Sequence, residues 1–378
     1  MRKLRINKSP RWILVLTVLW LAGSPVFPCS TFMLKSGKAV LVGHNLDEYG
    51  HVPGVVAVNK RNTAKTALSW AALLSGKPDV TPPLDWVSKY ASVTFNSLGR
   101  EFPDGGMNEA GLFIGEMTLR ETRFPSDPAK PKLFMCLWMQ YLLDNFETVA
   151  QVVESAAAVA VDGWGWHFFA ADKTGNTASL EFLNGALVVH AGETIPVPVL
   201  GNSRYEEEMT RLALYSGFGG EKPVVLEDRE MPRFVQAAHM LKAYSPTIKP
   251  PVDYAFDVLR QMERGNTQWS YVCDLKNQEA FFWTAKSASG KSVRLKNFDP
   301  GCEMPSLFLD IHAELQGDVS REFREYSPAA NREHVRQAWE AVMKISPPFK
   351  ALLMMSRTTK EELIERFAAY ADETRCVK

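Results

Sequence analysis

The stretch Cys29-Ser-Thr-Phe-Met-Leu-Lys35, followed by Ala39-Val-Leu-Val-Gly-His-Asn45, decides how this chain is interpreted. Both segments are rich in apolar and β-type residues, and the turn Ser36-Gly37-Lys38 separates them, which is typical of a β-hairpin. The expected hairpin lets Asp47, just beyond its second strand, fold back beside Cys29. A cysteine and a carboxylate are therefore predicted to meet at one end of a sheet.

Further strands and helices are predicted in groups along the chain. Strands are expected at 55–60, 112–118, 166–171, 178–183, 186–190, 267–275, 279–285 and 292–298. Helices are expected at 133–159, 203–216, 232–244, 252–263 and over most of 301–378. Grouped strands with helices between the groups favour a layered α+β fold over alternating βαβ units. We expect a signal peptide with a short propeptide over 1–28, one main domain over 29–300, and a helical C-terminal extension over 301–378 packed on the same domain.

The first 28 residues are predicted to direct export rather than to fold. Basic residues precede position 12 without any acidic one, and residues 12–23 are almost entirely apolar. A basic start before a short apolar run is typical of a secretory signal peptide, and a membrane-spanning helix needs about 20 residues. We expect a periplasmic or secreted protein without stable membrane insertion after processing. An uncleaved membrane anchor is the alternative.

The residues around the expected cleavage site suggest two cuts. Small residues favour a first cut near Gly23 or Ser24. Pro28 directly before Cys29 is unusual for a signal peptidase, and Phe27 fits a lipid-attachment site poorly. We therefore expect a second, self-catalysed cut that leaves Cys29 as the first residue.

The composition excludes several classes of protein. The chain has 43 basic and 43 acidic residues, a formal net charge of +0 and 46% hydrophobic residues, which is an ordinary globular mixture. These values exclude a disordered chain and argue against a nucleic-acid partner. The histidines and cysteines lack the spacing of a metal site, and the glycine-rich nucleotide motifs and the GxSxG elbow are missing from the sequence. We expect no metal and no cofactor.

A cysteine at the start of a mature chain can be a nucleophile. A thiol has a pKa of about 8.5 and an α-amine one of about 7.7–8.0. The amine is partly uncharged near neutral pH, so it can take the thiol proton within the same residue. Such a nucleophile needs a carboxylate to orient its amine, and amide or cationic groups to stabilise thiolate and oxyanion.

Three residues are candidates for these supporting roles, and each has a plainer alternative. Asp47 could orient the amine, or could simply end its strand in a turn. Asn202 could donate its amide to an oxyanion, or could belong to a helix start, because Ser203-Arg-Tyr-Glu206 has the capping-box pattern. Arg233 stands in the first turn of an expected helix, where a cation opposes the helix dipole. That mismatch suggests another purpose, with a surface ion pair as the alternative.

The other cysteines have structural interpretations. Cys136 and Cys273 are expected in the core, and Cys302 and Cys376 could form a disulfide in an exported protein. Residues 61–103 are irregular and contain scattered aromatic residues, so we expect them to shape the mouth of a pocket.

Five segments follow one another along the chain: Cys29-Ser-Thr-Phe32 with Gly43-His-Asn-Leu-Asp47, Met107-Asn-Glu-Ala-Gly-Leu112, Val199-Leu-Gly-Asn-Ser203, Met231-Pro-Arg-Phe234, and Thr267-Gln-Trp-Ser270 with Asp274-Leu-Lys-Asn277. In this order they resemble the choloylglycine hydrolase, or linear amide C–N hydrolase, family, which includes penicillin V acylases and bile salt hydrolases. The resemblance implies an N-terminal-nucleophile hydrolase fold, two stacked antiparallel sheets between helical layers (αββα), over 29–300.

The resemblance also implies roles for individual residues. It makes Cys29 the nucleophile with its amine as base, and Asp47 the group that holds the amine and the thiol. It gives Asn202 a place in the oxyanion hole and Arg233 electrostatic support of the nucleophile. Two positions depart from the family pattern: His44 stands where an arginine is usual and could be cationic depending on pH, and Thr118 stands where an asparagine is usual and could offer its hydroxyl.

The resemblance therefore implies an enzyme that cleaves a linear, non-peptide C–N amide bond through a thioester. The expected partner is a small-molecule N-acyl amide such as penicillin V, a bile acid conjugate or an N-acyl homoserine lactone. The sequence leaves a homo-oligomer open. An acyltransferase that uses the same thioester, and an inactive exported binding protein of this fold, are the alternatives.

Overall fold

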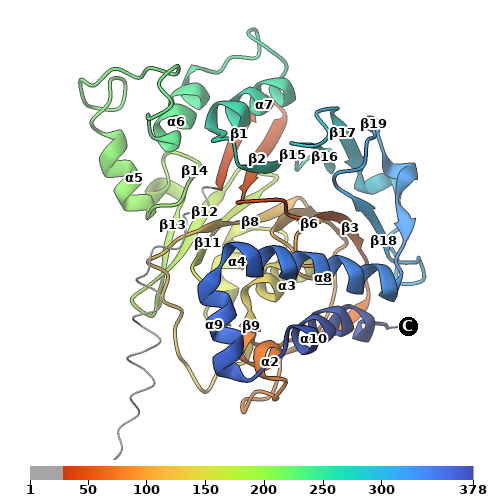
Figure 1. Cartoon of the computed structure of the whole chain (residues 1–378). Helices are drawn as coiled ribbons and strands as arrows, with labels where there is room; N and C mark the ends of the chain where they lie inside the picture. Colours follow the sequence, from red (N-terminus) through yellow and green to blue (C-terminus); the bar gives the residue numbers. More distant parts are fainter. Residues whose placement is uncertain (1–28, 378) are drawn as a thin grey trace, which may run out of the picture.

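The structure is a computed structural model that describes residues 29–377, and two large β-sheets dominate it (Figure 1). In spatial order, the seven-stranded sheet contains β14 (Val199–Leu200), β1 (Ser30–Ser36), β2 (Ala39–Asp47), β15 (Thr267–Asp274), β16 (Glu279–Thr284), β17 (Lys291–Arg294) and β19 (Gly317–Asp318). The nine-stranded sheet contains β13 (Ala186–Ala191), β12 (Thr177–Leu183), β11 (Trp166–Asp172), β8 (Leu112–Thr118), β7 (Gly105–Asn108), β6 (Ser92–Asn96), β3 (Val55–Asn59), β18 (Leu307–Asp310) and β20 (Arg324–Glu325). The predicted signal peptide and propeptide lie outside the described residues.

Two small sheets and the helices complete the described part of the chain. The small sheets pair β9 (Lys132–Phe134) with β10 (Ala160–Asp162), and β21 (Arg375–Cys376) with β4 (Thr63–Thr66) and β5 (Asp85–Val87). The α-helices are α2 (Trp70–Ser75), α3 (Met135–Asn145), α4 (Val149–Ser155), α5 (Tyr205–Leu212), α6 (Arg233–Ala243), α7 (Pro251–Met262), α8 (Pro328–Ile345), α9 (Pro347–Ser356) and α10 (Lys360–Glu373).

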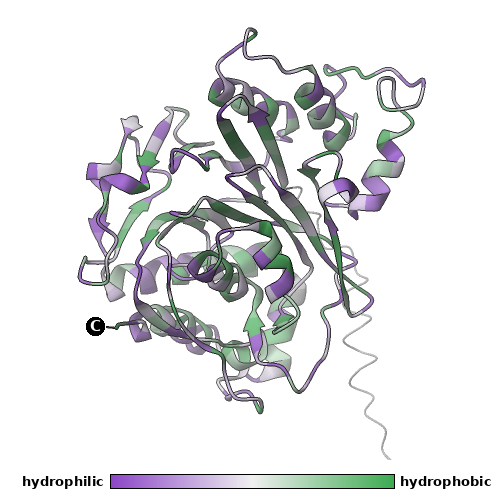
Figure 2. Ribbon diagram, turned by 180° about the vertical axis from the view of Figure 1, so that it is seen from behind, coloured by the Kyte–Doolittle hydropathy of each residue, from purple (hydrophilic) through white to green (hydrophobic). Residues whose placement is uncertain are grey.

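The two large sheets face each other across one apolar core. Phe95 of β6 stacks on Tyr271 of β15 with ring centroids 3.9 Å apart. Helices α6 and α7 pack on the outer face of the seven-stranded sheet, and α3 and α4 pack on that of the nine-stranded sheet. The central strands are therefore buried on both faces and read as nearly continuous apolar runs, which appear green in Figure 2.

The predicted hairpin is confirmed. Strands β1 and β2 pair antiparallel with Ser30 opposite Asn45 and Ser36 opposite Ala39. Gly37 in the connecting turn has φ 55°, a left-handed conformation that glycine adopts without a steric penalty. Strands β3, β8, β11, β12, β13, β15, β16 and β17 also lie where strands were expected.

The single helix predicted over 133–159 is wrong, because α3 ends at Asn145 and α4 begins at Val149. Asn108 explains the end of α3, since its Nδ2 donates to the carbonyl oxygens of Leu143 and Phe146 at 2.8 and 2.7 Å. Thr148 then caps α4 in a capping box with Gln151. The helical spacing of apolar residues continues across this break, so the sequence alone predicted one helix.

The interpretation of residues 61–103 also needs correction. A second apolar core lies between the nine-stranded sheet and helices α3, α8 and α10. Trp86 is buried in this core, and Trp70 packs against it. These aromatic side chains therefore support the C-terminal helices instead of surrounding a pocket mouth. The helical part of the C-terminal segment begins only at Pro328, because residues 307–325 form short strands that join both large sheets.

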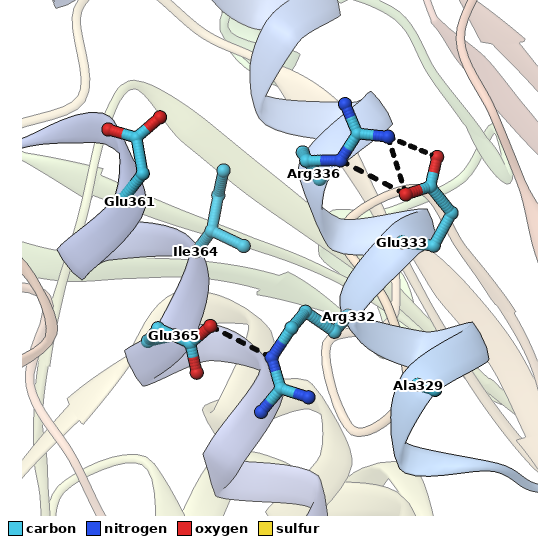
Figure 3. A pocket seen from close by; sticks show the side chains of 7 residues that line it. All are labelled: Ala329, Arg332, Glu333, Arg336, Glu361, Ile364 and Glu365. Carbon is cyan, nitrogen blue, oxygen red and sulfur yellow. Dashed lines mark hydrogen bonds and ion pairs between the residues drawn. The ribbon is translucent and has the colours of Figure 1, made fainter.

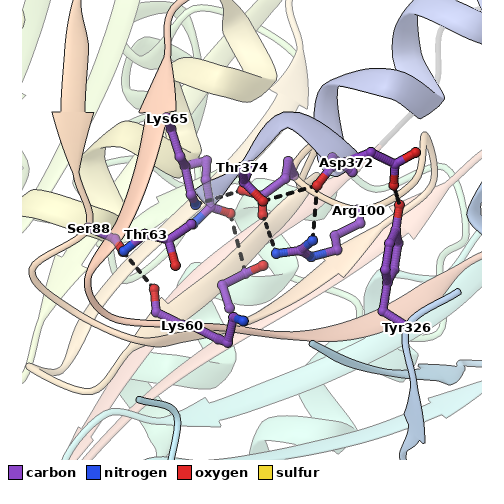
Figure 4. A network of polar contacts seen from close by, with 12 residues as sticks. Lys60, Thr63, Lys65, Ser88, Arg100, Tyr326, Asp372 and Thr374 are labelled. Atoms are coloured by element: carbon purple, nitrogen blue, oxygen red, sulfur yellow. Dashed lines mark hydrogen bonds and ion pairs between the residues drawn. The ribbon is translucent and has the colours of Figure 1, made fainter. Parts of the chain in front are cut away.

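A buried charge network contacts the C-terminal helix α10, because Nη1 of Arg100 donates to the carbonyl oxygen of Ala371 at 3.2 Å. Lys65 Nζ lies 2.6 Å from Glu101 and 2.9 Å from Asp144, and Arg100 pairs with Glu101 at 2.9 Å. Figure 4 shows Arg100 beside Tyr326, with an aromatic ring 5.0 Å from its guanidinium carbon. Two cations and two carboxylates balance within this network, which satisfies the condition for burying charge.

Candidate active site

Strand pairing brings the start of β1 together with the ends of two neighbouring strands. Strand β14 pairs with β1 with Leu200 opposite Thr31. Continuing that register by two residues places Asn202 opposite Cys29. Strand β2 lies on the other side of β1 and ends at Asp47. The two-residue periodicity of strands thus assembles the predicted cysteine, amide and carboxylate from distant parts of the sequence.

Cys29 is buried at this meeting point, with 2% of its surface exposed. Its Sγ lies 3.8 Å from the backbone oxygen of Asp47 and 3.9 Å from Oε1 of Glu116. Burial raises the pKa of the Cys29 thiol well above its usual value, and the neighbouring carboxylates of Glu116 and Asp47 raise it further. The resting thiol is therefore neutral, and a base has to remove its proton when it reacts.

Arg233 links two of the predicted residues. Its Nη1 lies 3.0 Å from Oδ2 of Asp47, and its Nη2 donates to Oδ1 of Asn202 at 2.8 Å. Arg233 is the first residue of α6, which packs on β1 and β14. The cation at this helix start is thus a largely buried bridge, with 15% of its side chain exposed, and not a surface ion pair.

Asp47 is held by a second group that was not singled out for a role in the sequence. Thr267, at the start of β15 and opposite Asp47 in the register, donates its hydroxyl to Oδ1 of Asp47. Burial raises the pKa of Asp47 to about 6, although Arg233 and the Thr267 hydroxyl both lower it. Asp47 is thus ionised at neutral pH and close to titration in mild acid.

Asn202 contacts Thr118, but the contact is with the backbone of Thr118 and not with its hydroxyl. Nδ2 of Asn202 donates to the carbonyl oxygen of Thr118 at 2.9 Å. The amide nitrogen carries a second proton that can serve another acceptor. The capping box expected at Ser203 is wrong: α5 begins at Tyr205, and its N-cap Arg204 has no side-chain capping bond.

His44, which the sequence left open as a pH-dependent cation, is neutral in the structure. It is fully buried, its Nδ1 lies 2.7 Å from the Thr31 hydroxyl, and its ring stacks on Tyr271 with centroids 5.0 Å apart. Burial lowers the pKa of His44 to about 3, so the ring is neutral at every physiological pH. Sequence alone could not establish this, because the burial comes from the facing sheet.

Glu116 is the residue that the sequence analysis did not place in the site. It is buried in β8, and among residues 29–377 its Oε2 has no hydrogen-bond partner. Burial raises its pKa well above the usual value, and the nearby Asp104 and Glu48 raise it further. The pKa of Asp104 itself rises to about 7 and that of Glu48 to about 8, both chiefly through burial. The sequence did contain one signal for Glu116, because it is the single charged residue inside the apolar run 112–117.

The remaining predicted features lie away from this site. Cys136 and Cys273 are buried free thiols, as expected, and Cys302 is bonded to Cys376. A hollow between α8 and α10 is lined by Ala329, Arg332, Glu333, Arg336, Glu361, Ile364 and Glu365 (Figure 3). Its arginines pair with glutamates of the same hollow, so it offers no reactive group.

The fold and the site define a mixed α/β protein in which a buried cysteine meets a bridged carboxylate and amide. The chain belongs to the linear amide C–N hydrolases of the choloylglycine hydrolase family, which residues 85–303 match. A penicillin V acylase of Pectobacterium atrosepticum is 27% identical over 263 residues, which cover 57% of this chain and 70% of that relative.

Solved structures have the same fold. A penicillin V acylase from Agrobacterium tumefaciens superposes with a TM-score of 0.68 at 24% identity and covers 79% of this chain and 98% of its own. A variant of the conjugated bile acid hydrolase from Clostridium perfringens gives a TM-score of 0.57 at 15% identity, with 79% and 96% covered. Within the described residues, every helix is too short or too polar to cross a membrane.

Proposed function

We propose that this protein is a cysteine N-terminal-nucleophile hydrolase that cleaves the linear amide of an N-acyl substrate through a thioester. The observation that carries the proposal is the largely buried bridge from Asp47 through Arg233 to Asn202, next to the sulfur of Cys29. The facing sheets with outer helices support the αββα order of such hydrolases. Because strands after residue 300 join both sheets, we treat 29–377 as one folded unit.

The reaction begins with the free α-amine of Cys29. The neutral amine takes the thiol proton, and the sulfur adds to the amide carbonyl carbon, whose π electrons move onto oxygen. When the tetrahedral intermediate collapses, the C–N bond breaks, and its electron pair takes the proton back from the ammonium group. Water then adds to the thioester with the amine as base, and the C–S bond breaks to release the acid.

The surrounding residues would stabilise these steps. Asp47 orients the amine, and Arg233 fixes Asp47 while offsetting its charge. The second proton of the Asn202 amide is the side-chain donor for the oxyanion. Removing one such donor from a hydrolase typically costs about 10²–10³ in kcat. The raised thiol pKa supports a mechanism in which base and nucleophile act together, without a stable resting thiolate.

Export and self-processing complete the proposal. We infer that residues 1–28 are removed, because the amine of Cys29 becomes a base only when no residue precedes it. The disulfide between Cys302 and Cys376 supports an oxidising location such as the periplasm or the extracellular space. Penicillin V is the first substrate to test, because two of the similar proteins are penicillin V acylases.

The decisive experiment combines intact mass with activity. We expect a mature mass that starts at Cys29, and release of the acid from penicillin V or another N-acyl amide. Cys29→Ser, correctly processed, should retain at most weak activity, while Cys273→Ala serves as the matched buried-thiol control. A mature chain that starts elsewhere, or a Cys29→Ser variant that works at the parental rate, would overturn the proposal.

A further inference from the structure

A buried histidine–glutamate pair lies behind the segment that carries Asn202. His167 of β11 and Glu181 of β12 are fully buried, and Nδ1 of His167 lies 3.0 Å from Oε1 of Glu181. Nε2 of His167 lies 2.8 Å from the carbonyl oxygen of Gly201. The same Oε1 of Glu181 accepts the backbone N–H of Tyr205 at 2.9 Å. The pair thus contacts both ends of the segment 201–205.

Counting protons at these contacts shows that His167 and Glu181 share one. A carbonyl oxygen only accepts, so Nε2 of His167 must carry a proton toward Gly201. A neutral ring would then turn the Nδ1 lone pair toward Oε1 of Glu181 at 3.0 Å. Two lone pairs at this distance repel each other, so a proton lies between Nδ1 and Oε1. The stable state is an imidazolium–carboxylate pair, or the equivalent pair with the proton on the carboxyl group.

The segment held by this pair places the oxyanion donor. Asn202 follows Gly201 directly, and its side chain is fixed by Thr118 and Arg233. The contacts at Gly201 and Tyr205 fix the backbone on either side of it. An oxyanion donor works only when it is held within a fraction of an ångström of the developing charge. The backbone contacts at Gly201 and Tyr205 and the side-chain contacts of Asn202 thus act on the same residue.

Other titratable groups face the pair from the neighbouring elements. Nε2 of His190 on β13 lies 3.8 Å from Oε2 of Glu181, and its ring lies 5.0 Å from that of Tyr205. On α5, Glu208 lies near Gly201 and is paired with Arg211 at 2.9 Å. The facing residue on β8 is Met117, which carries no charge.

We propose that His167 and Glu181 form a clamp, joined by a shared proton, that positions Asn202 for catalysis. The inference rests on the proposed function, and it assigns both as positioning residues that act through Asn202. Removing either partner frees the 201–205 segment and lowers kcat, whereas the substrate KM changes little because the clamp acts through Asn202 alone.

The test compares His167→Phe and Glu181→Gln with the control His239→Gln, a half-buried histidine on α6 outside the clamp. In His167→Phe, we expect hydrogen–deuterium exchange of residues 201–205 to speed up at least tenfold. We expect kcat of the same variant to fall by about tenfold to 10³-fold, where the upper bound corresponds to complete loss of the oxyanion donor. Glu181→Gln should also lower kcat, while KM stays near the parental value in both clamp variants. The control should match the parent in all three measurements.

Two results would overturn the clamp. One is parental exchange of the Tyr205 amide together with parental kcat in both clamp variants. The other comes from ¹⁵N NMR of the parent protein, which does not depend on how the variants fold: a His167 ring with one protonated nitrogen at pH 6, and no proton shared with Glu181, contradicts the proposal. The exchange and NMR measurements need no substrate, so they judge the clamp even where the parent hydrolyses no amide and the proposed function itself fails.

Discussion

Asp47 sets a second acid limit of the proposed reaction, below the one that protonation of the α-amine imposes. Its carboxylate must be ionised to hold the α-amine and Arg233, and its pKa is raised to about 6 by burial. The ionised fraction falls as the pH drops below that value, so we expect the decline of kcat/KM to steepen by about a further tenfold per pH unit below pH 6. Initial rates between pH 4 and 8 measure this limb.

The matched variant for this limb is Asp47→Asn, which keeps the shape and one acceptor oxygen. It should be at least ~100-fold less active at pH 7, in the range typical of lost acid–base groups. Its residual activity should lack the limb near pH 6. Retention of that limb in the variant would assign the titration to another group, such as Asp104, whose pKa is raised to about 7.

Glu116 lies 3.9 Å from the nucleophilic sulfur, and its Oε1 accepts the hydrogen bond that the Cys29 thiol donates. Burial raises the pKa of Glu116 well above its usual value. An amide oxygen can accept the same bond from the thiol. Glu116→Gln should therefore keep kcat within about fivefold of the parent at pH 7. Glu116→Leu should lose at least ~10-fold, which corresponds to about 1.4 kcal/mol, a typical value for one hydrogen bond. Equal losses in both variants would show that the carboxylate form is required.

Asn108 joins the β7–β8 turn to the end of α3. Its Nδ2 donates to two carbonyls of the α3 C-terminus, and its Oδ1 accepts the amides of Ala110 and Leu112 at 3.1 and 2.9 Å. Asn108→Ala leaves these buried groups unpaired, so we expect a loss of about 3 kcal/mol in the free energy of unfolding. Thr148→Ala, which removes only the α4 cap, should cost about 1 kcal/mol. Urea unfolding measures both, and equal costs would contradict the joining role of Asn108.

The elements show where sequence reasoning succeeded. The first hairpin, the 166–190 meander and the strand bearing Thr267 have local signals, namely apolar runs bounded by turn residues, and those predictions are confirmed. The break between α3 and α4 depends on Asn108, which comes from another part of the chain. The predicted residues Cys29, Asp47, Asn202 and Arg233 do converge, but the neutral state of His44 and the position of Glu116 depend on the facing sheet, which no local pattern encodes.

The molecule as a whole is held together by contacts between distant parts of the sequence. Lys65, Glu101 and Asp144 meet in one buried network, although none is near another in the chain. Such pairings follow from the packing of α3 and the C-terminal helices on the nine-stranded sheet, and charge patterning alone could not predict them. The C-terminal helices lie away from the site, but they pack on the sheet that carries Thr118 and Glu116 and thus stabilise it.

The disulfide between Cys302 and Cys376 closes the C-terminal segment over 74 residues of sequence, with Cα atoms 5.3 Å apart. Closing a loop of this length removes conformational freedom from the unfolded chain, which corresponds to a stabilisation of about 4 kcal/mol. The double variant Cys302→Ser with Cys376→Ser should therefore unfold at a distinctly lower urea concentration than the parent. Dithiothreitol should destabilise the parent to the level of this variant and leave the variant unchanged. A parent that is insensitive to the reductant, with a double variant of equal stability, would show that the C-terminal helices are held by the Lys65 network and the second core alone.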